Sequence, residues 1–331
     1  MTDLVELIKR ADSGDYIAQW EVASYIIHTL TPEEKDKDLL DRAVEYLRNA
    51  AIHGVMQGIA SEELGELYFK GEYFDQDYKQ AIMWFRTSTQ KLNPIGYYLL
   101  GFCFYHGRGV DKNKAKAFDS FFKGTHGFIN NYLMLGDMYL NGEFVARDQA
   151  YAIKLYQRVL SSEKKLHEKN NIFSDAYFQV CLRFAQCYLC GNGVKQDIDK
   201  ANDCFRIARE HDNREYWLPE DRHDLLRLLD SSPYKNYKAS RRGVSKKMID
   251  TEDGDNGALL DKGVRYATGD GVKKDARKAY HYLVKHVLLN NNDSTAYKYL
   301  ADIYPRLTRL ERDPIFVERC RELSNKDERK S

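Results

Sequence analysis

The chain has 331 residues, with 51 lysines and arginines against 50 aspartates and glutamates. This balance lacks the basic excess of a protein that binds nucleic acid along its whole length. Hydrophobic residues make up 43%, which is enough apolar material for a folded core. No run approaches the roughly 20 apolar residues that span a bilayer, the first residues do not resemble a signal peptide, and six cysteines are too few for a disulfide scaffold. We therefore expect a cytoplasmic protein.

The predicted elements begin with a helix pair of irregular sequence. Apolar residues at helical spacing predict one helix around 18–23 and a second around 43–47, joined by the charged segment 31–38. The end units of a stacked array differ from its inner units, because one of their faces meets water. Residues 1–56 are accordingly predicted to be an N-terminal capping repeat.

Five segments then superpose on one another, beginning at Leu64, Leu100, Leu135, Phe184 and Lys262. In every copy a small residue lies six positions before a glycine, and that glycine lies ten positions before an alanine. The small residues are Gly65, Gly101, Gly136, Ala185 and Gly263; the glycines are Gly71, Gly107, Gly142, Gly191 and Gly269; the alanines are Ala81, Ala117, Ala152, Ala201 and Ala279. Two constant spacings in five copies indicate one repeated structural unit.

Each copy predicts two helices, which we name helix A and helix B. The small residue and an aromatic residue three positions later lie on the apolar side of helix A, where a small side chain allows a neighbouring helix to approach closely. The following glycine suits the left-handed residue that ends a helix. Six positions further on, an aspartate or asparagine is placed to cap helix B; these residues are Asp77, Asn113, Asp148, Asp197 and Asp275.

An interruption at 212–256 separates the fourth copy from the fifth. It contains an apolar stretch at 219–229 and a segment, 234–247, with six basic residues and no acidic one. The interruption is predicted to be a helical or basic insertion, or a decayed repeat. After the fifth copy, Pro305 ends a further helix A and 316–323 forms a last helix, so 257–325 holds one repeat and a C-terminal capping repeat. Residues 326–331 are predicted to be a disordered tail.

The motif resembles the Sel1-like repeat, a relative of the tetratricopeptide repeat. The loop signature is Gly107-Arg-Gly-Val110, repeated at 191–194 and 269–272, and a Lys-Ala pair opens helix B at 116, 200 and 278. The copies at 71–74 and 142–145 lack the second glycine, so a different turn is expected there. The resemblance covers roughly 18–323, with regular copies at 57–211. It implies an all-α fold, a right-handed α/α solenoid of helix-turn-helix repeats, acting as a non-enzymatic adaptor or scaffold for a protein or peptide partner.

Cys187, Cys190, Cys204 and His211 have a spacing that superficially suggests a zinc site. Across the copies, however, Cys187 and Cys204 occupy apolar packing positions, which favours buried thiols over a zinc site or a redox pair. The histidines form no zinc-binding HExxH motif, and the glycine loop lacks the strand and the lysine of a phosphate-binding loop. We expect no catalytic residue, metal or cofactor.

A protein or peptide partner is expected on the concave face of the array, which helix A is expected to line by analogy with tetratricopeptide arrays. Residues one position after the small residue, or one turn before it, point away from its packed side. They form the predicted partner-binding set Glu62, Glu66, Tyr98, Phe102, Leu133, Asp137, Gln186 and Asp302. An alternative is a nucleic-acid-associated adaptor that uses a basic patch of Lys235, Lys238, Arg241, Arg242, Lys246 and Lys247.

Overall fold

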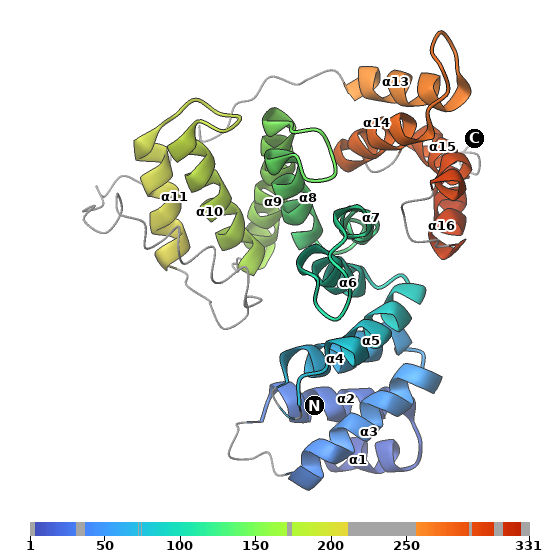
Figure 1. Cartoon of the computed structure of the whole chain (residues 1–331). Coiled ribbons are helices and arrows are strands. Elements are labelled where there is room, and N and C mark those ends of the chain that lie inside the picture. The colour runs from blue at the N-terminus through green and yellow to red at the C-terminus, as the bar shows by residue number, and fades with distance from the viewer. Residues whose placement is uncertain are drawn as a thin grey trace. The chain divides into compact units, whose positions relative to one another are not determined.

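The computed structural model describes residues 4–30, 37–71, 73, 75–170, 174–210, 256–290, 293–307 and 314–325. Every regular element among them is helical (Figure 1). The elements are α1 (Leu4–Asp12), α2 (Tyr16–His28), α3 (Lys37–His53), α4 (Gln57–Lys70), α5 (Tyr78–Gln90), α6 (Pro94–His106), α7 (Lys114–Gly124), α8 (Asn130–Asn141), α9 (Gln149–Asn170), α10 (Asp175–Cys190), α11 (Ile198–Glu210), α13 (Asn256–Thr268), α14 (Ala276–Leu289), α15 (Ser294–Ile303), the 3-10 helix η3 (Tyr304–Arg306) and α16 (Pro314–Ser324). The prediction of an all-α array of helical hairpins is confirmed. Most of the predicted interruption at 212–256 and the predicted tail at 326–331 lie outside the described residues.

Local chemistry sets the ends of the helices in each hairpin. The glycine after helix A has a φ between 69° and 87° in all five copies, which is the left-handed conformation that the spacing predicts. The following acid or amide then caps helix B. In the α4–α5 hairpin, the Asp77 carboxylate accepts hydrogen bonds from the backbone amides of Lys79 and Gln80, at 2.9 and 3.1 Å. Both predicted helix-terminus signals are thus confirmed.

The small residue of helix A lies against the middle of its own helix B. A Cβ on Gly136 would lie 2.3 Å from Cε1 of Tyr156, and one on Gly65 would lie 2.5 Å from the ring of Phe85. Real Cβ atoms do not approach this closely, so a larger residue would force the two helices apart. The close approach inferred from the sequence is therefore present in the hairpins.

The chain divides into two compact units, one of residues 1–128 with 309–318 and the other of residues 129–308 with 319–331. In the first unit, α1 to α4 enclose a continuous apolar core. Its C-terminal segment places the Phe316 ring 5.9 Å from the ring of Phe122 on α7. Lys123 lies beside Phe316 and forms a buried ion pair with Asp119, at 2.7 Å. Packing in this unit thus joins residues that are far apart in the sequence.

In three of the five copies, a lysine at the start of helix B lies over the recurring aromatic ring of helix A in the same copy. The ammonium groups of Lys116, Lys200 and Lys278 lie 5.2, 5.4 and 5.1 Å from the ring centres of their partners. Those partners are Phe104, Tyr188 and Tyr266. This cation–π contact gives the Lys-Ala motif a structural role in the hairpin.

The α8–α9 hairpin differs, because Tyr151 stands where three of the other copies have this lysine and the α4–α5 hairpin has Gln80. Lys285 of α14 supplies the missing cation, with its ammonium 5.2 Å from the Tyr139 ring centre and 4.8 Å from that of Tyr151. The same ammonium pairs with Asp148 at 2.7 Å. A residue more than a hundred positions away thus completes this repeat, in the second unit.

Further contacts fasten α14 to α9 within the second unit. The Tyr151 hydroxyl and the Arg158 guanidinium donate hydrogen bonds to the carbonyls of Lys285 and Leu288, at 2.6 and 2.7 Å. The Leu288 carbonyl belongs to the last turn of α14, where helix carbonyls lack partners in their own helix, and the Lys285 carbonyl lies just before that turn. Phe144, which stands in place of the second loop glycine and has a φ of 65°, lies 5.3 Å from the His281 ring. The sequence departures of this repeat therefore coincide with its contacts to α14.

Candidate functional site

The predicted partner-binding residues on α6 and α8 are largely buried. Tyr98 and Phe102 on α6 are 6% and 0% exposed, and Leu133 on α8 is 1% exposed. The Phe102 ring lies 6.0 Å from that of Phe69, and the Tyr98 ring lies 5.2 Å from that of Phe128. The expectation that these three side chains face a partner is wrong. The physical reason is that α6 and α8 are apolar on nearly all sides, and such helices are buried on all sides.

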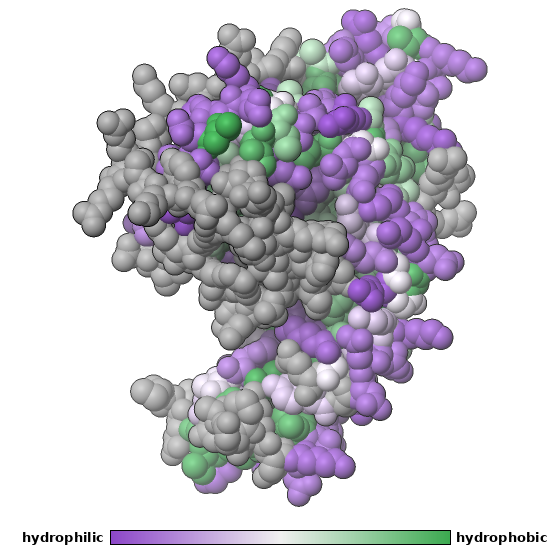
Figure 2. All heavy atoms as spheres, turned by 60° about the vertical axis from the view of Figure 1, so that its left-hand side comes forward, coloured by the Kyte–Doolittle hydropathy of each residue, from purple (hydrophilic) through white to green (hydrophobic). Residues whose placement is uncertain are grey.

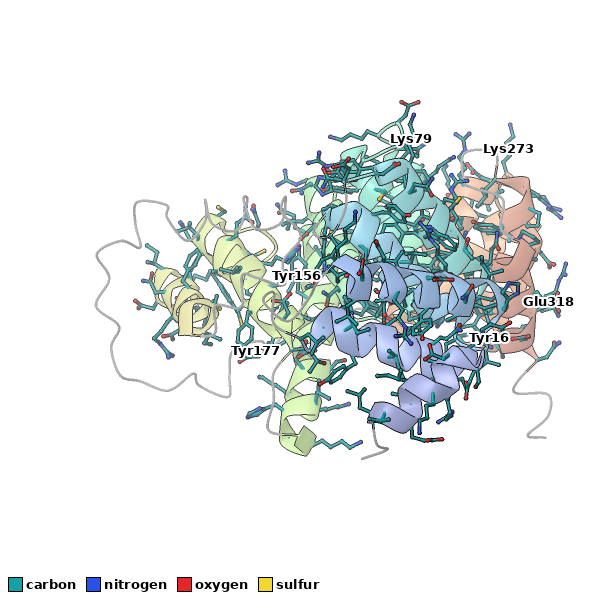
Figure 3. All side chains as sticks on the ribbon, turned by 90° about the horizontal axis from the view of Figure 1, so that it is seen from below. Tyr16, Lys79, Tyr156, Tyr177, Lys273 and Glu318 are labelled. Carbon is teal, nitrogen blue, oxygen red and sulfur yellow. The ribbon has the colours of Figure 1, made fainter. Side chains whose placement is uncertain are left out.

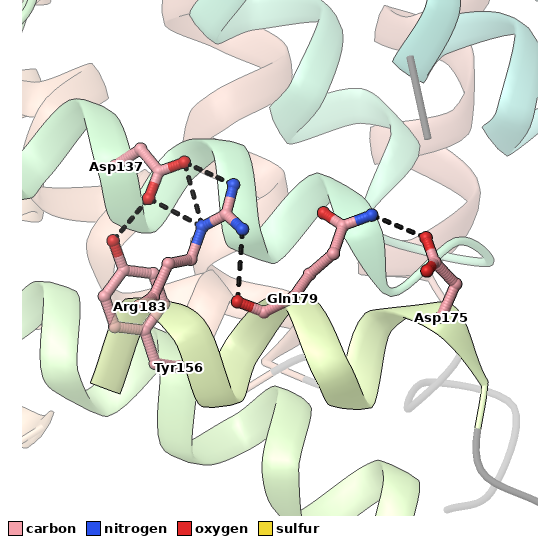
Figure 4. A network of polar contacts seen from close by, with 5 residues as sticks. All are labelled: Asp137, Tyr156, Asp175, Gln179 and Arg183. Atoms are coloured by element: carbon pink, nitrogen blue, oxygen red, sulfur yellow. Dashed lines mark hydrogen bonds and ion pairs between the residues drawn. The ribbon is translucent and has the colours of Figure 1, made fainter. Parts of the chain in front are cut away.

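Asp137 is engaged inside the protein (Figure 4). The Arg183 guanidinium donates hydrogen bonds from Nε and Nη2 to the Asp137 carboxylate, at 2.6 to 3.0 Å. The Tyr156 hydroxyl donates to the same carboxylate at 2.5 Å. Arg183 also donates to the Gln179 carbonyl of its own helix. The contacts of Asp137 with Tyr156 and Arg183 join α8, α9 and α10. Asp137 therefore stabilises the contact between two repeats, and its carboxylate is already occupied by two donors.

The remaining predicted residues lie in different settings. Glu62 is buried, Glu66 on α4 and Gln186 on α10 are half-buried, and Asp302 on α15 is exposed. Glu62 and Glu66 are neighbours on one helix, while Gln186 and Asp302 belong to the other unit. The structure thus brings together only the two glutamates of α4.

An accessible surface with mixed apolar and acidic character lies on α2 and α4 of the first unit. Ile17 on α2 and Ile59 on α4 are 41% and 38% exposed. The Trp20 indole connects the two helices by donating to Glu63 at 3.1 Å. We call this surface the acidic helix-A face and define it by Ile17, Trp20, Glu21, Ile59, Glu63 and Glu66. Figure 2 shows that apolar patches are small on the described surface of one side of the molecule, where hydrophilic residues predominate.

The glutamates of α4 repel one another in a partly buried setting. Burial, with further contributions from Glu66 and Glu63, raises the pKa of Glu62 to about 8. Burial also raises the pKa of Glu63 to about 7, although the hydrogen bond from Trp20 opposes this. Lys70 pairs with Glu66 at 2.9 Å at the end of the helix. A cation from a partner would favour the ionised carboxylates and would therefore lower the pKa values of Glu62 and Glu63.

Sequence reasoning identified Glu66 but missed Ile17, Ile59 and Glu63. The rule that selected residues one position after the small residue assumes that every helix A has the same accessible side. The signal that was available is the run of Ile59, Glu63 and Glu66, which recurs at helical spacing on the side of α4 opposite its apolar residues.

The cysteines do not form a cation site among the residues that the structure describes. Cys187 and Cys204 are fully buried, whereas Cys190 is exposed. Burial raises the pKa of the Cys187 thiol to about 12, which favours the neutral thiol over the thiolate that zinc requires. The described part of the chain contains no cluster of histidine, cysteine and carboxylate side chains suited to a metal ion. His211 and the basic patch at 235–247 lie outside the described residues, so the nucleic-acid alternative stays a prediction.

A helix apolar and long enough to cross a membrane is not found in the described ranges. Solved structures with similar chains include a protective antigen of uropathogenic Escherichia coli with an SLR fold, with 18% identity, a TM-score of 0.44, and coverage of 99% of this chain and 91% of that one. A Sel1 repeat protein from Oxalobacter formigenes has 19% identity, a TM-score of 0.40, and coverage of 98% and 100%. Helicobacter pylori cysteine rich protein B has 23% identity, a TM-score of 0.31, and coverage of 39% and 95%. No curated protein matches the chain.

The Sel1 repeat family model matches six segments, at 17–55, 59–91, 94–119, 132–158, 174–213 and 260–285. These matches cover more than half of the chain and include all five copies found by internal comparison. The first match also shows that the irregular pair at the N-terminus is a Sel1 repeat. Sel1 repeat proteins generally mediate protein–protein interaction. The chain belongs to the Sel1 repeat family.

Proposed function

We propose that this protein is a non-enzymatic cytoplasmic scaffold that binds a protein or peptide partner on its acidic helix-A face. The observation that carries the proposal is the distribution of exposed apolar side chains. On the helices A that the structure describes, large apolar residues are exposed on α2 and α4 and on none of the others. Exposed apolar residues beside charged ones are a common feature of binding surfaces for extended or helical peptides.

The charges of the face define the chemistry of the partner. Glu21, Glu63 and Glu66 surround two exposed isoleucines, so the matching segment carries lysine or arginine next to aliphatic or aromatic side chains. An incoming cation lowers the repulsion among the glutamates of α4. The raised pKa values of Glu62 and Glu63 reflect burial first and repulsion by neighbouring glutamates second. The apolar anchors supply most of the affinity and the charges supply orientation and rate.

The test is selection of binders from a short-peptide display library by the full chain. The expected winners combine a basic residue with an apolar anchor, and the double variant Ile17→Ser, Ile59→Ser weakens their binding by more than about tenfold. A control variant, Met83→Ser, removes an apolar side chain that is 47% exposed on α5, outside the face. Winners without basic residues, or equal binding to the double variant and the control, would show that the face is not the partner site.

A further inference from the structure

A basic pocket in the first unit shares no lining residue with the acidic helix-A face. Its volume is 650 Å³, and its walls come from α5, the loop 107–113 and the start of α7. Lys79 and Arg86 of α5 and Lys116 of α7 line it. Lys79 and Arg86 are seven residues apart, which is about two helical turns, so they lie on the same side of α5. Lys79 is labelled at the edge of the molecule in Figure 3.

The glycine loop brings the backbone close to the pocket wall. Gly107 and Gly109 have φ values of 77° and 69°, and both line the pocket. A Cβ on Gly109 would lie 2.8 Å from the backbone of Tyr78, so the loop rests directly on the first turn of α5. A larger side chain at Gly109 would therefore push apart the two repeats between which the pocket lies.

One of the cations is held in place before any ligand binds. The Lys116 ammonium lies 5.2 Å from the Phe104 ring centre, and Phe104 also lines the pocket. The Arg108 guanidinium lies 5.4 Å from the Tyr78 ring centre, at the same junction. A held cation loses less conformational freedom when a ligand binds, which favours affinity.

The combination of charges is peculiar to this junction. The positions of Lys79 in the other four copies hold Ala115, Ala150, Asp199 and Arg277, and those of Arg86 hold Phe122, Gln157, Arg206 and Val284. No other copy has a basic residue at both positions. Asp111 is the single carboxylate on the wall, against three basic side chains. The hairpin fold does not require these bases, since four copies fold without the pair.

We propose that this pocket binds a phosphorylated serine or threonine side chain of a partner protein. A phosphate ester carries nearly two negative charges and three acceptor oxygens at neutral pH. It therefore matches the Arg86 guanidinium and the ammonium groups of Lys79 and Lys116 better than a carboxylate, which carries one charge and two oxygens, would match them. The volume is in the range of ligand pockets and leaves room for residues on either side of the phosphate. This site shares no residue with the acidic helix-A face, so it goes beyond the proposed function and stands apart from it.

The experiment uses the full chain and three probes: a degenerate peptide library with a fixed central phosphoserine or phosphothreonine, the same library without phosphate, and inorganic phosphate. The phosphorylated library is expected to bind, and the double variant Lys79→Ala, Arg86→Ala is expected to weaken binding by more than about tenfold, because each lost contact is a charge-assisted hydrogen bond. Both side chains are exposed, so the variant is expected to keep the wild-type thermal unfolding curve.

The control variant, Lys273→Ala, Arg277→Ala, removes the same two charges from exposed positions in the other unit. Unchanged binding by the control supports a specific pocket. Equal binding of the phosphorylated and unphosphorylated libraries, equal losses in both double variants, or binding of inorganic phosphate with no gain from the peptide would each overturn the proposal. These variants leave the acidic helix-A face intact. A failure of the phosphate-pocket proposal can therefore be distinguished from a failure of the proposed partner binding on that face.

Discussion

Removal of Arg183 tests whether the ion pair between α8 and α10 stabilises the second unit. The Arg183 and Asp137 side chains are only 7% and 21% exposed. In Arg183→Ala, the Asp137 carboxylate keeps the Tyr156 hydroxyl but loses its cation and three hydrogen bonds. Breaking a buried pair by removing one partner costs about 3 to 5 kcal/mol. Because Asp137 retains some contact with water, we expect a loss near the lower end, about 3 kcal/mol.

The assay is urea denaturation of the full chain, followed by far-ultraviolet circular dichroism. The matched control is Arg265→Ala, which removes the same residue type from an exposed pair with Asp261, 3.0 Å apart and more than half exposed on both sides. An exposed pair of this kind contributes at most about 0.5 kcal/mol. Similar losses of unfolding free energy in the two variants would refute the conclusion that burial makes the Arg183–Asp137 pair more stabilising than the exposed pair.

A double variant distinguishes the cost of leaving a buried charge unpaired from the net contribution of the ion pair to stability. Asp137→Leu combined with Arg183→Met replaces the pair by apolar side chains of comparable length. Such replacements of buried pairs are often close to neutral, because no charge is left without its partner. The double variant is therefore expected to be more stable than Arg183→Ala alone. A double variant that is less stable than the single one would contradict this explanation.

Because its pKa is raised from 4.5 to about 8, Glu62 holds its proton more tightly in the folded chain than in the unfolded one, so stability falls as pH rises through that range. Glu62→Gln is expected to remove about 2 to 4 kcal/mol of this loss, measured by thermal unfolding across the range; an unchanged pH dependence would contradict the assignment. Gly136→Ala is expected to cost about 1 to 3 kcal/mol, because the new Cβ would meet the Tyr156 ring, and an unchanged unfolding midpoint would show that the hairpin tolerates the contact. Lys285→Ala removes the ammonium that pairs with Asp148, so amide hydrogen exchange in α14 is expected to accelerate, and unaltered protection would argue against this contact holding α14.

The position of the candidate partner site was predicted only in part. Glu66 was predicted and lies on the acidic helix-A face, but Phe102 was predicted by the same rule and is fully buried. The rule locates a residue relative to its own hairpin, where neighbours are at most a few tens of residues away. Exposure depends on everything packed around the helix, including segments that no local spacing specifies.

The local residue pattern is enough to specify the helical hairpin, its ends and its internal packing. Glycine at a left-handed position, an aspartate cap and a small residue opposite a large one all act within one hairpin, so their spacing is sufficient. The roles of the residues that depart from the repeat pattern become visible only in the folded chain. Phe144 and Tyr151 look like defects of one repeat, yet they meet His281 and Lys285 of α14. Such partners are found only when the chain is folded, because the contact joins residues more than a hundred positions apart and depends on the path of every hairpin between them.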